Sequence, residues 1–450
     1  MMRFKKIFGI TFLVLIISIC GIAGLNYSKL TILTGYSAKH MNSSVFIGNR
    51  SVEFTDTKDN NFAPVNLADD KVNMQEKTSV ASVFGLKERK AVYREGLGSV
   101  LINEDFDQSQ PIVIPNRIKT KTGLPYPYGE LSQKDTVFNT IDYEKINTTV
   151  ASIFDSNNEN IKKTRAVMVL YKDQIIAEKY VDGLDKNSKL PGWSMTKSVL
   201  ATVYGVLQKQ GAINIKDKAP VAEWQNDERR DITIHNLLQM NCGLEWDEDY
   251  GSISDATKML YLDSDMTTAQ IHKKAIYKPN EYWYYSSGVS NLLSGILRNY
   301  FSSYQEYLDY PYRELIDKIG MHSMLIETDI AGNYVGSSYA WATVRDWAKF
   351  GLLYLHRGNW NGTQIFNPEW TDYVTTPSPT SEGDYGGHFW LNAGGFYPDA
   401  PRDMFSANGY QGQRVFIIPS KNLVIVRFGL IGDAGVDFNT FLKEMVSAVE

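Results

Sequence analysis

From about residue 131 onward, the apolar positions of the chain follow the periods of regular secondary structure. Residues 166–171 and 174–180 are two β-rich apolar runs separated by two residues, which predicts a β-hairpin. Residues 198–210 carry apolar side chains at helical spacing and are followed by Gly211, which predicts a helix and its stop signal. A loop between them joins strand to helix.

The rest of the chain contains more helix-like segments and then returns to strands. Residues 235–240 and 344–356 have helical spacing, whereas residues 414–418 and 423–428 are β-rich runs separated by a turn. A closing helix is predicted at 436–449. Strands at both ends with helices between them predict an α+β fold, in which one antiparallel sheet is flanked by helices and interrupted by an inserted helical subdomain.

The N-terminal residues 1–25 read as a membrane segment. A short basic stretch is followed by residues 7–25, which contain no charged side chain and are long enough to cross a bilayer. The basic flank favours a cytoplasmic N-terminus and export of the rest. We expect an N-terminal transmembrane helix in the cytoplasmic membrane, with the body of the protein on the periplasmic or extracellular side. Small residues at 21–23 leave a cleaved signal peptide, and hence secretion, as the alternative.

Residues 26–130 differ in character from the segment that follows. The polar stretches 56–61 and 68–71 predict loops, and the Pro-bounded run 110–115 predicts an extended piece. We interpret residues 26–130 as an N-terminal extension that wraps around a single large domain at 131–450.

Composition narrows the classes of function. Lys and Arg total 46 against 51 Asp and Glu, and no long basic run occurs, which argues against a nucleic-acid partner. The six histidines form no His-Glu-x-x-His pattern, so no metal site and no cofactor are predicted.

The strongest chemical signal lies at the start of the helix predicted at 198–210. Ser194 and Lys197 are three residues apart, a spacing that places both side chains on one helical face. A serine hydroxyl becomes nucleophilic when a base removes its proton, and a partly desolvated lysine can be that base. We predict Ser194 as nucleophile and Lys197 as base; an N-capping serine beside a solvated lysine is the alternative.

A second signal is a tyrosine-rich loop before the helix-like run 292–297. Tyr285 in this loop is our choice for the general acid/base that protonates a leaving group. Tyr284 is its rival, and a tyrosine that only packs in the core is the plain alternative.

A third signal is the Gly-rich turn at 405–413, which enters the strand predicted at 414–418. Glycines at 409 and 412 allow close approach of the backbone to a substrate. The N–H of Gln413 could then complete an oxyanion hole with the N–H of Ser194. An ordinary β-turn is the alternative.

These three motifs, in this order, resemble the class C β-lactamase and penicillin-binding family. The S-x-x-K spacing is followed by Tyr-x-Ser and by a Gly-rich turn that enters a C-terminal strand. Within the family, the sequence is most similar to the branch that includes 6-aminohexanoate-dimer hydrolases and related esterases. The resemblance covers residues 125–450 and, more loosely, 36–104. It is carried by the stretches 192–198, 243–251, 342–351 and 408–414.

The resemblance implies a β-lactamase/transpeptidase-like fold and a serine hydrolase. The Lys-Thr-Gly or His-x-Gly signature of the family is replaced by Tyr-Gln-Gly at 410–412, which provides no cation for a penicillin carboxylate. Ser287 stands where many β-lactamases have Asn, and by resemblance Tyr250 lines the substrate pocket. Beside Ser194, the predicted oxyanion and substrate-binding residues are Gln411, Gly412, Gln413, Ser287 and Tyr250.

The function predicted from the sequence is hydrolysis of a small amide or ester through a Ser194 acyl-enzyme. Two alternatives stay open: a cell-wall D-Ala-D-Ala peptidase or true β-lactamase, and a catalytically silent binding protein on the same scaffold. The expected partners are the small-molecule substrate and, through the N-terminal segment, the membrane.

Overall fold

The computed structural model describes residues 27–155 and 161–450. The membrane segment predicted at 1–25 lies outside these residues. Across the two described ranges, no helix combines the length and the hydrophobicity needed to cross a bilayer.

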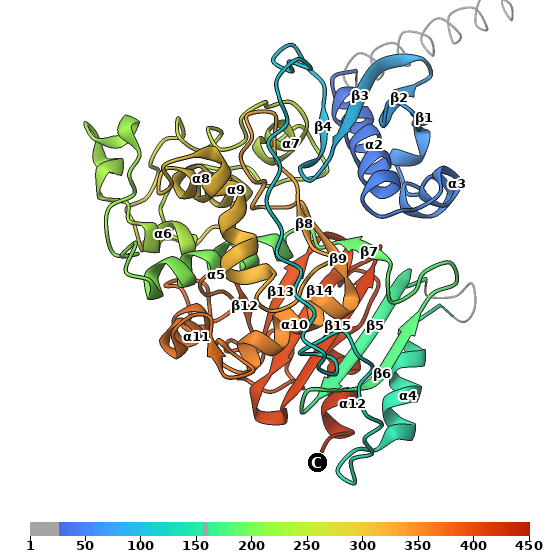
Figure 1. Cartoon of the computed structure of the whole chain (residues 1–450). Helices are drawn as coiled ribbons and strands as arrows, with labels where there is room; N and C mark the ends of the chain where they lie inside the picture. The colour runs from blue at the N-terminus through green and yellow to red at the C-terminus, as the bar shows by residue number, and fades with distance from the viewer. Residues whose placement is uncertain (1–26, 156–160) are drawn as a thin grey trace, which may run out of the picture.

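A six-stranded antiparallel sheet forms the centre of the molecule (Figure 1). Its strand order is β12-β13-β14-β15-β5-β6, so the C-terminal strand β15 pairs with β5, which precedes it by most of the chain. The antiparallel sheet predicted from distant segments is therefore confirmed. The strands are Trp390–Leu391 (β12), Phe405–Gly409 (β13), Gln413–Ile418 (β14), Leu423–Gly429 (β15), Thr164–Tyr171 (β5) and Gln174–Tyr180 (β6).

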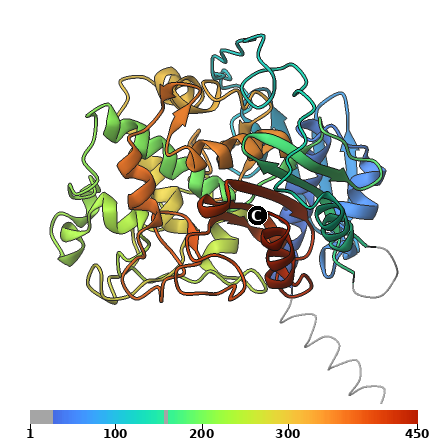
Figure 2. The same cartoon turned by 90° about the horizontal axis from the view of Figure 1, so that it is seen from below.

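Both faces of this sheet are covered, which explains the continuous apolar run in β5. Met168 and Leu170 point into a cluster shared with the helical region, whereas Val167 and Val169 point into a second cluster. The second cluster includes side chains from α4 (Tyr143–Ser152) and α12 (Phe438–Ser447). These two helices lie side by side on one face (Figures 1 and 2). In a strand that is buried on both faces, apolar and polar side chains do not alternate along the sequence.

The opposite face carries α10 (Val344–Leu355) and the helical region. The helices predicted at 198–210, 235–240, 344–356 and 436–449 are all present, with ends shifted by a few residues. Besides α10, the helices of this region are α5 (Met195–Lys209), α6 (Ile234–Leu238), α7 (Asp255–Tyr261), α8 (Ser287–Arg298), α9 (Tyr304–Pro311) and α11 (Pro368–Thr375). Small sheets are formed by β7 (Lys189–Pro191), β9 (Ala340–Thr343) and β8 (Leu325–Ile326), and by β10 (Asn359–Trp360) and β11 (Thr363–Gln364).

The N-terminal extension contains more regular structure than its sequence pattern indicates. Helix α2 (Lys29–Phe46) packs across a four-stranded antiparallel sheet (Figure 1). The loops predicted at 56–61 and 68–71 are instead a π-helical turn, Thr55–Asp59, and the start of β1. The strands are Asp69–Asn73 (β1), Thr78–Val83 (β2), Leu86–Arg94 (β3) and Gly98–Leu101 (β4), and the short α3 is Val52–Phe54.

The sequence of α2 shows no apolar helical period because its buried face is largely polar. Ser37 donates to Asp70 of β1 at 2.7 Å, and Thr34 donates to the Lys87 carbonyl oxygen of β3 at 2.7 Å. Asn42 accepts from the Ser99 hydroxyl of β4 at 2.7 Å. Hydrogen bonds to the sheet thus replace the apolar contacts that a helical period would reveal.

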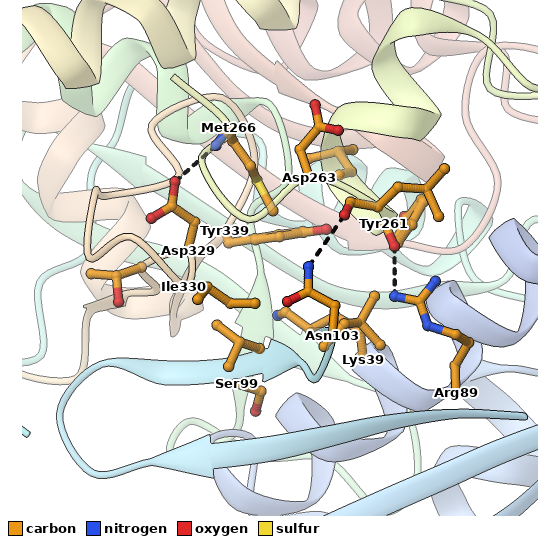
Figure 3. A pocket seen from close by; sticks show the side chains of 15 residues that line it. Lys39, Arg89, Ser99, Asn103, Tyr261, Asp263, Met266, Asp329, Ile330 and Tyr339 are labelled. Atoms are coloured by element: carbon orange, nitrogen blue, oxygen red, sulfur yellow. Dashed lines mark hydrogen bonds between the residues drawn. The ribbon is translucent and has the colours of Figure 1, made fainter. Parts of the chain in front are cut away.

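Buried charges fasten the extension to the large domain. Lys39 of α2 pairs with Glu327 at 2.8 Å, and both side chains are almost fully buried. Glu327 also accepts from the Ser99 N–H and from Trp341 Nε1. Figure 3 shows the same seam around a small cavity, where Arg89 of β3 donates to the Tyr261 carbonyl oxygen at 2.8 Å.

Replacing Lys39 by Met should lower the free energy of unfolding by about 3–5 kcal/mol, because the Glu327 carboxylate would stay buried without its cation. Urea denaturation measures the change. The control is Lys77→Met, which removes the exposed Lys77–Glu95 pair and should cost less than about 1 kcal/mol. Equal losses in the two variants would contradict the assignment of the buried pair as the fastening contact.

Candidate active site

Ser194 lies at the N-cap position of α5, but its side chain makes no capping hydrogen bond. Its Oγ lies 3.1 Å from the Nζ of Lys197, one turn further along the same face. The capping alternative for Ser194 does not apply here. The preceding residue, Trp193, has a φ of 48°, a conformation that is strained for a bulky side chain.

Lys197 is enclosed by hydroxyl and carbonyl oxygens. Its Nζ lies 2.9 Å from Ser287 Oγ and 2.9 Å from the Ser337 carbonyl oxygen, and the residue is 1% exposed. Burial lowers the pKa of Lys197 to about 8, and the Glu248 carboxylate opposes part of that shift. At neutral pH, roughly a tenth of the molecules would therefore carry an uncharged amine. This lysine meets the requirement for a base.

Tyr285 is the third member of the group. Its ring centroid lies 4.9 Å from Lys197 Nζ, and its ring packs against Tyr385 and Trp390. Burial, followed by the Glu248 charge, raises the pKa of Tyr285, so the phenol retains its proton and can donate it. The rival Tyr284 is 41% exposed and stacks on another surface tyrosine.

Glu248 belongs to the site although the sequence analysis did not select it. Its carboxylate accepts from the Ser287 N–H at 2.8 Å and from the Tyr250 hydroxyl at 2.7 Å. Ser287 Oγ and Trp246 Nε1 also donate to it. One carboxylate thus holds the serine that contacts Lys197 and stabilises the protonated lysine. An acidic residue two positions before Tyr250, inside a family-like stretch, was the available signal.

The structure brings two of the predicted substrate-binding residues to the site. Tyr250 and Ser287 are linked by a hydroxyl–hydroxyl contact of 3.1 Å, and Tyr250 lines the cavity at Ser194. Burial of its hydroxyl, with the nearby Glu248 charge, raises the pKa of Tyr250. Tyr250 is therefore a neutral hydrogen-bonding group at the cavity wall.

The Gly-rich turn meets the nucleophile loop at another residue than expected. A Cβ on Gly409, the last residue of β13, would lie 2.1 Å from the Gly192 carbonyl oxygen, so only glycine permits this approach. The next residue, Tyr410, lines the cavity together with Ser194. Gly409 therefore brings the end of β13 against the loop that holds the nucleophile.

Gln411, Gly412 and Gln413 do not reach the cavity at Ser194. The first and last of these residues line a separate small cavity, and the Gln413 side chain bonds to Gly429. A Cβ on Gly412 would lie 2.6 Å from an Arg427 nitrogen, so this glycine makes room for a buried arginine and not for a substrate.

Sequence and structure comparisons identify the family. The sequence model of the beta-lactamase family matches residues 159–429, well over half of the chain. The chain belongs to the beta-lactamase family. Its members are serine hydrolases, and the resemblance predicted from the three motifs is confirmed. A search of curated proteins finds no match.

Solved structures of low sequence identity share the fold of this beta-lactamase family protein. A candidate 6-aminohexanoate-dimer hydrolase from Bacillus anthracis is 21% identical, with a TM-score of 0.55 over 64% of this chain and 79% of that one. An octameric penicillin-binding protein homologue from Pyrococcus abyssi is 16% identical, with a TM-score of 0.52 over 68% and 77%. EstCE1, described as a hydrolase with promiscuous acyltransferase activity, is 11% identical, with a TM-score of 0.55 over 68% and 99%.

The pH dependence of covalent labelling tests the Lys197 environment. The rate at which a fluorophosphonate labels Ser194 should rise with pH through a midpoint near 8, because the uncharged amine activates the hydroxyl. Glu248→Gln should move this midpoint to lower pH, since the carboxylate that favours the charged lysine is gone.

Glu245→Gln is the matched control, because Glu245 is an exposed carboxylate of the same segment. An unmoved midpoint in Glu248→Gln, or an equal shift in both variants, would contradict the electrostatic link. The measurement is intact-mass detection of the labelled protein against time.

Proposed function

We propose that this protein is a serine hydrolase that cleaves an amide or ester through an acyl-enzyme on Ser194. The observation that carries the proposal is the 3.1 Å contact between Ser194 Oγ and a buried Lys197 amine with a pKa of about 8. The Ser, Lys and Tyr of the motifs converge on one point, which supports catalysis over a silent binding protein on this scaffold.

In acylation, uncharged Lys197 accepts the proton of Ser194 as Oγ attacks the carbonyl carbon. The resulting oxyanion is held by two backbone N–H groups, those of Ser194 and Tyr410. Neither N–H has a hydrogen-bond acceptor among the described residues, and both residues line the same cavity. Tyr410 thus takes the place that the sequence suggested for Gln413.

The tetrahedral intermediate collapses when the leaving group receives a proton. Tyr285 donates its phenolic proton to the leaving nitrogen or oxygen, and the Lys197 ammonium restores it. In the second half-reaction, a water molecule attacks the acyl-enzyme after losing a proton to the same pair of groups. The acid is released and Ser194 regains its proton.

Glu248 has a positioning role in this scheme. It holds Ser287, which contacts Lys197 Nζ, and it holds Tyr250 at the cavity wall. Its charge also keeps the lysine from becoming too weak a base.

The cavity lining favours substrates other than penicillins. Among the described residues that line it, Lys29 at the N-terminal end of α2 is the one basic side chain. A penicillin carboxylate would find no cation on β13 beside Ser194. We infer that the physiological substrate is another amide or ester, and labelling by a fluorescent penicillin would instead favour the peptidase or β-lactamase alternative.

We further propose that residues 1–25 anchor the enzyme to the membrane, or direct its export.

Ser194→Ala should reduce hydrolysis of p-nitrophenyl acetate by at least about a thousandfold, because the hydroxyl that forms the acyl bond is removed. Release of p-nitrophenol is the measurement, and intact mass should show one acetyl group on the wild type alone. The unfolding midpoint of the variant serves as the folding control. Unchanged turnover would refute Ser194 as the nucleophile.

Tyr285→Phe should reduce hydrolysis of alkyl esters and amides by about 10²–10⁴-fold, since it removes the proton donor. The loss should be smaller for p-nitrophenyl esters, whose leaving group departs as a stable anion. Tyr284→Phe is the matched control and should behave as the wild type. Equal losses for both classes of leaving group would exclude Tyr285 as the general acid.

A further inference from the structure

A cavity of about 650 Å³ opens directly beside Ser194. One side is built by the large domain, through Trp193, Tyr410 and residues 249–253. The other side is built by the N-terminal extension, through α2 and the segment 62–67. The second wall lies outside the stretch 159–429 that matches the family, so it is a feature of this chain in addition to the shared fold.

The wall from the extension is mostly apolar. Most of its side chains are apolar, namely Leu30, Ile32, Leu33, Phe62, Ala63, Pro64, Val65 and Leu67, while Lys29 and Tyr36 are its polar members. Opposite it, Ile253 contributes another aliphatic side chain. Among the lining residues that the structure describes, Lys29 and Asp249 are the charged ones. A pocket of this size and composition suits a flexible apolar group much more than a polar one.

The position of Tyr285 indicates which half of the substrate enters the cavity. Tyr285 must contact the leaving group, yet it does not line the cavity, and its ring packs against Tyr385 and Trp390. Tyr410, whose N–H would hold the oxyanion, does line it. The cavity therefore extends from the carbonyl carbon on the side away from the leaving group, where the acyl half lies.

The wall from the extension is rigidly placed relative to the nucleophile. Tyr36 and His40 of α2 lie nearly parallel to the ring of Trp193, each with a centroid distance of 6.0 Å. Trp193 immediately precedes Ser194. The helix that lines the cavity thus also packs against the strained residue of the nucleophile loop.

We propose that this cavity binds a medium to long aliphatic acyl chain, and that the N-terminal extension determines this specificity. The substrates are then fatty-acyl esters or amides whose carbonyl lies at Ser194 and whose chain lies against α2. This inference rests on the proposed function, because it assigns the acyl half of the same reaction.

The first test is the dependence of kcat/KM on acyl length. For p-nitrophenyl acetate, butyrate, octanoate and dodecanoate, below their critical micelle concentrations, kcat/KM should rise about two- to fourfold per methylene until the cavity is filled. A flat or falling series in an enzyme that still hydrolyses the acetate through Ser194 would overturn the acyl-chain proposal and leave the hydrolase proposal intact.

The second test narrows the cavity from the side of the extension. Ile32 lines the cavity and is half-buried. Ile32→Trp should lower the dodecanoate-to-acetate ratio of kcat/KM at least tenfold. Ile112→Trp is the matched control, because Ile112 is an exposed isoleucine of the same extension away from the lining, and its ratio should equal that of the wild type. An unchanged ratio in Ile32→Trp would contradict a role of the extension in chain binding.

A binding measurement separates this inference from hydrolysis. Dodecanoate should quench the tryptophan fluorescence of Ser194→Ala, since Trp193 lines the cavity, whereas acetate should not. Saturable dodecanoate binding that Ile32→Trp weakens would support the acyl cavity even if no ester were turned over. Absence of saturable binding together with a flat kinetic series would refute it.

Discussion

The site depends on an amine that is buried among neutral oxygens. Lys197 loses most of its hydration, and its contacts are two serine hydroxyls and one carbonyl oxygen, with no carboxylate among them. A direct ion pair would keep the lysine charged, whereas complete isolation would make it too weak a base. Glu248 lies one residue further out, behind Ser287, and its charge acts from there. This separation is how the site keeps the pKa near the range where a base is useful.

The N-terminal extension is part of this arrangement and not an appendage. Its helix α2 is fastened by the buried Lys39–Glu327 pair and packs on Trp193, the residue before the nucleophile. Moving α2 away from the large domain would leave the Glu327 carboxylate buried without its cation, which is strongly unfavourable. The same helix forms an apolar wall of the cavity at Ser194. In the proposed enzyme, the extension therefore selects the substrate and the shared domain supplies the chemistry.

Close backbone packing completes the site. The end of β13 approaches the nucleophile loop because Gly409 has no Cβ to collide with the Gly192 carbonyl oxygen. Because β13 belongs to the central sheet, this contact fixes the position of Tyr410 relative to Ser194. Donors held in this way are preorganised, which is the condition under which backbone N–H groups stabilise an oxyanion effectively.

Local patterns in the sequence determined much of this protein. The hairpin at 166–180, the helix that follows Ser194 and the C-terminal strands were all predictable, because their apolar spacing reflects burial in the sheet and its flanking helices. The i, i+3 spacing placed Ser194 and Lys197 together, since helical geometry alone fixes that distance. The order of the motifs indicated the family.

Only the tertiary structure decided the rest. Helix α2 was not predicted because many of its buried side chains are polar and hydrogen-bond to β1, β3 and β4. Such partners leave no apolar periodicity in the sequence of the helix. Glu248 lies in the site although it was not predicted there, because it contacts Ser287. Gln413 was predicted in the site but bonds to Gly429 instead. Both contacts join segments that are apart in the sequence. The cavity depends on two such segments meeting. Periodicity reports whether a side chain is buried, but which group faces a polar side chain depends on how the whole chain closes around it.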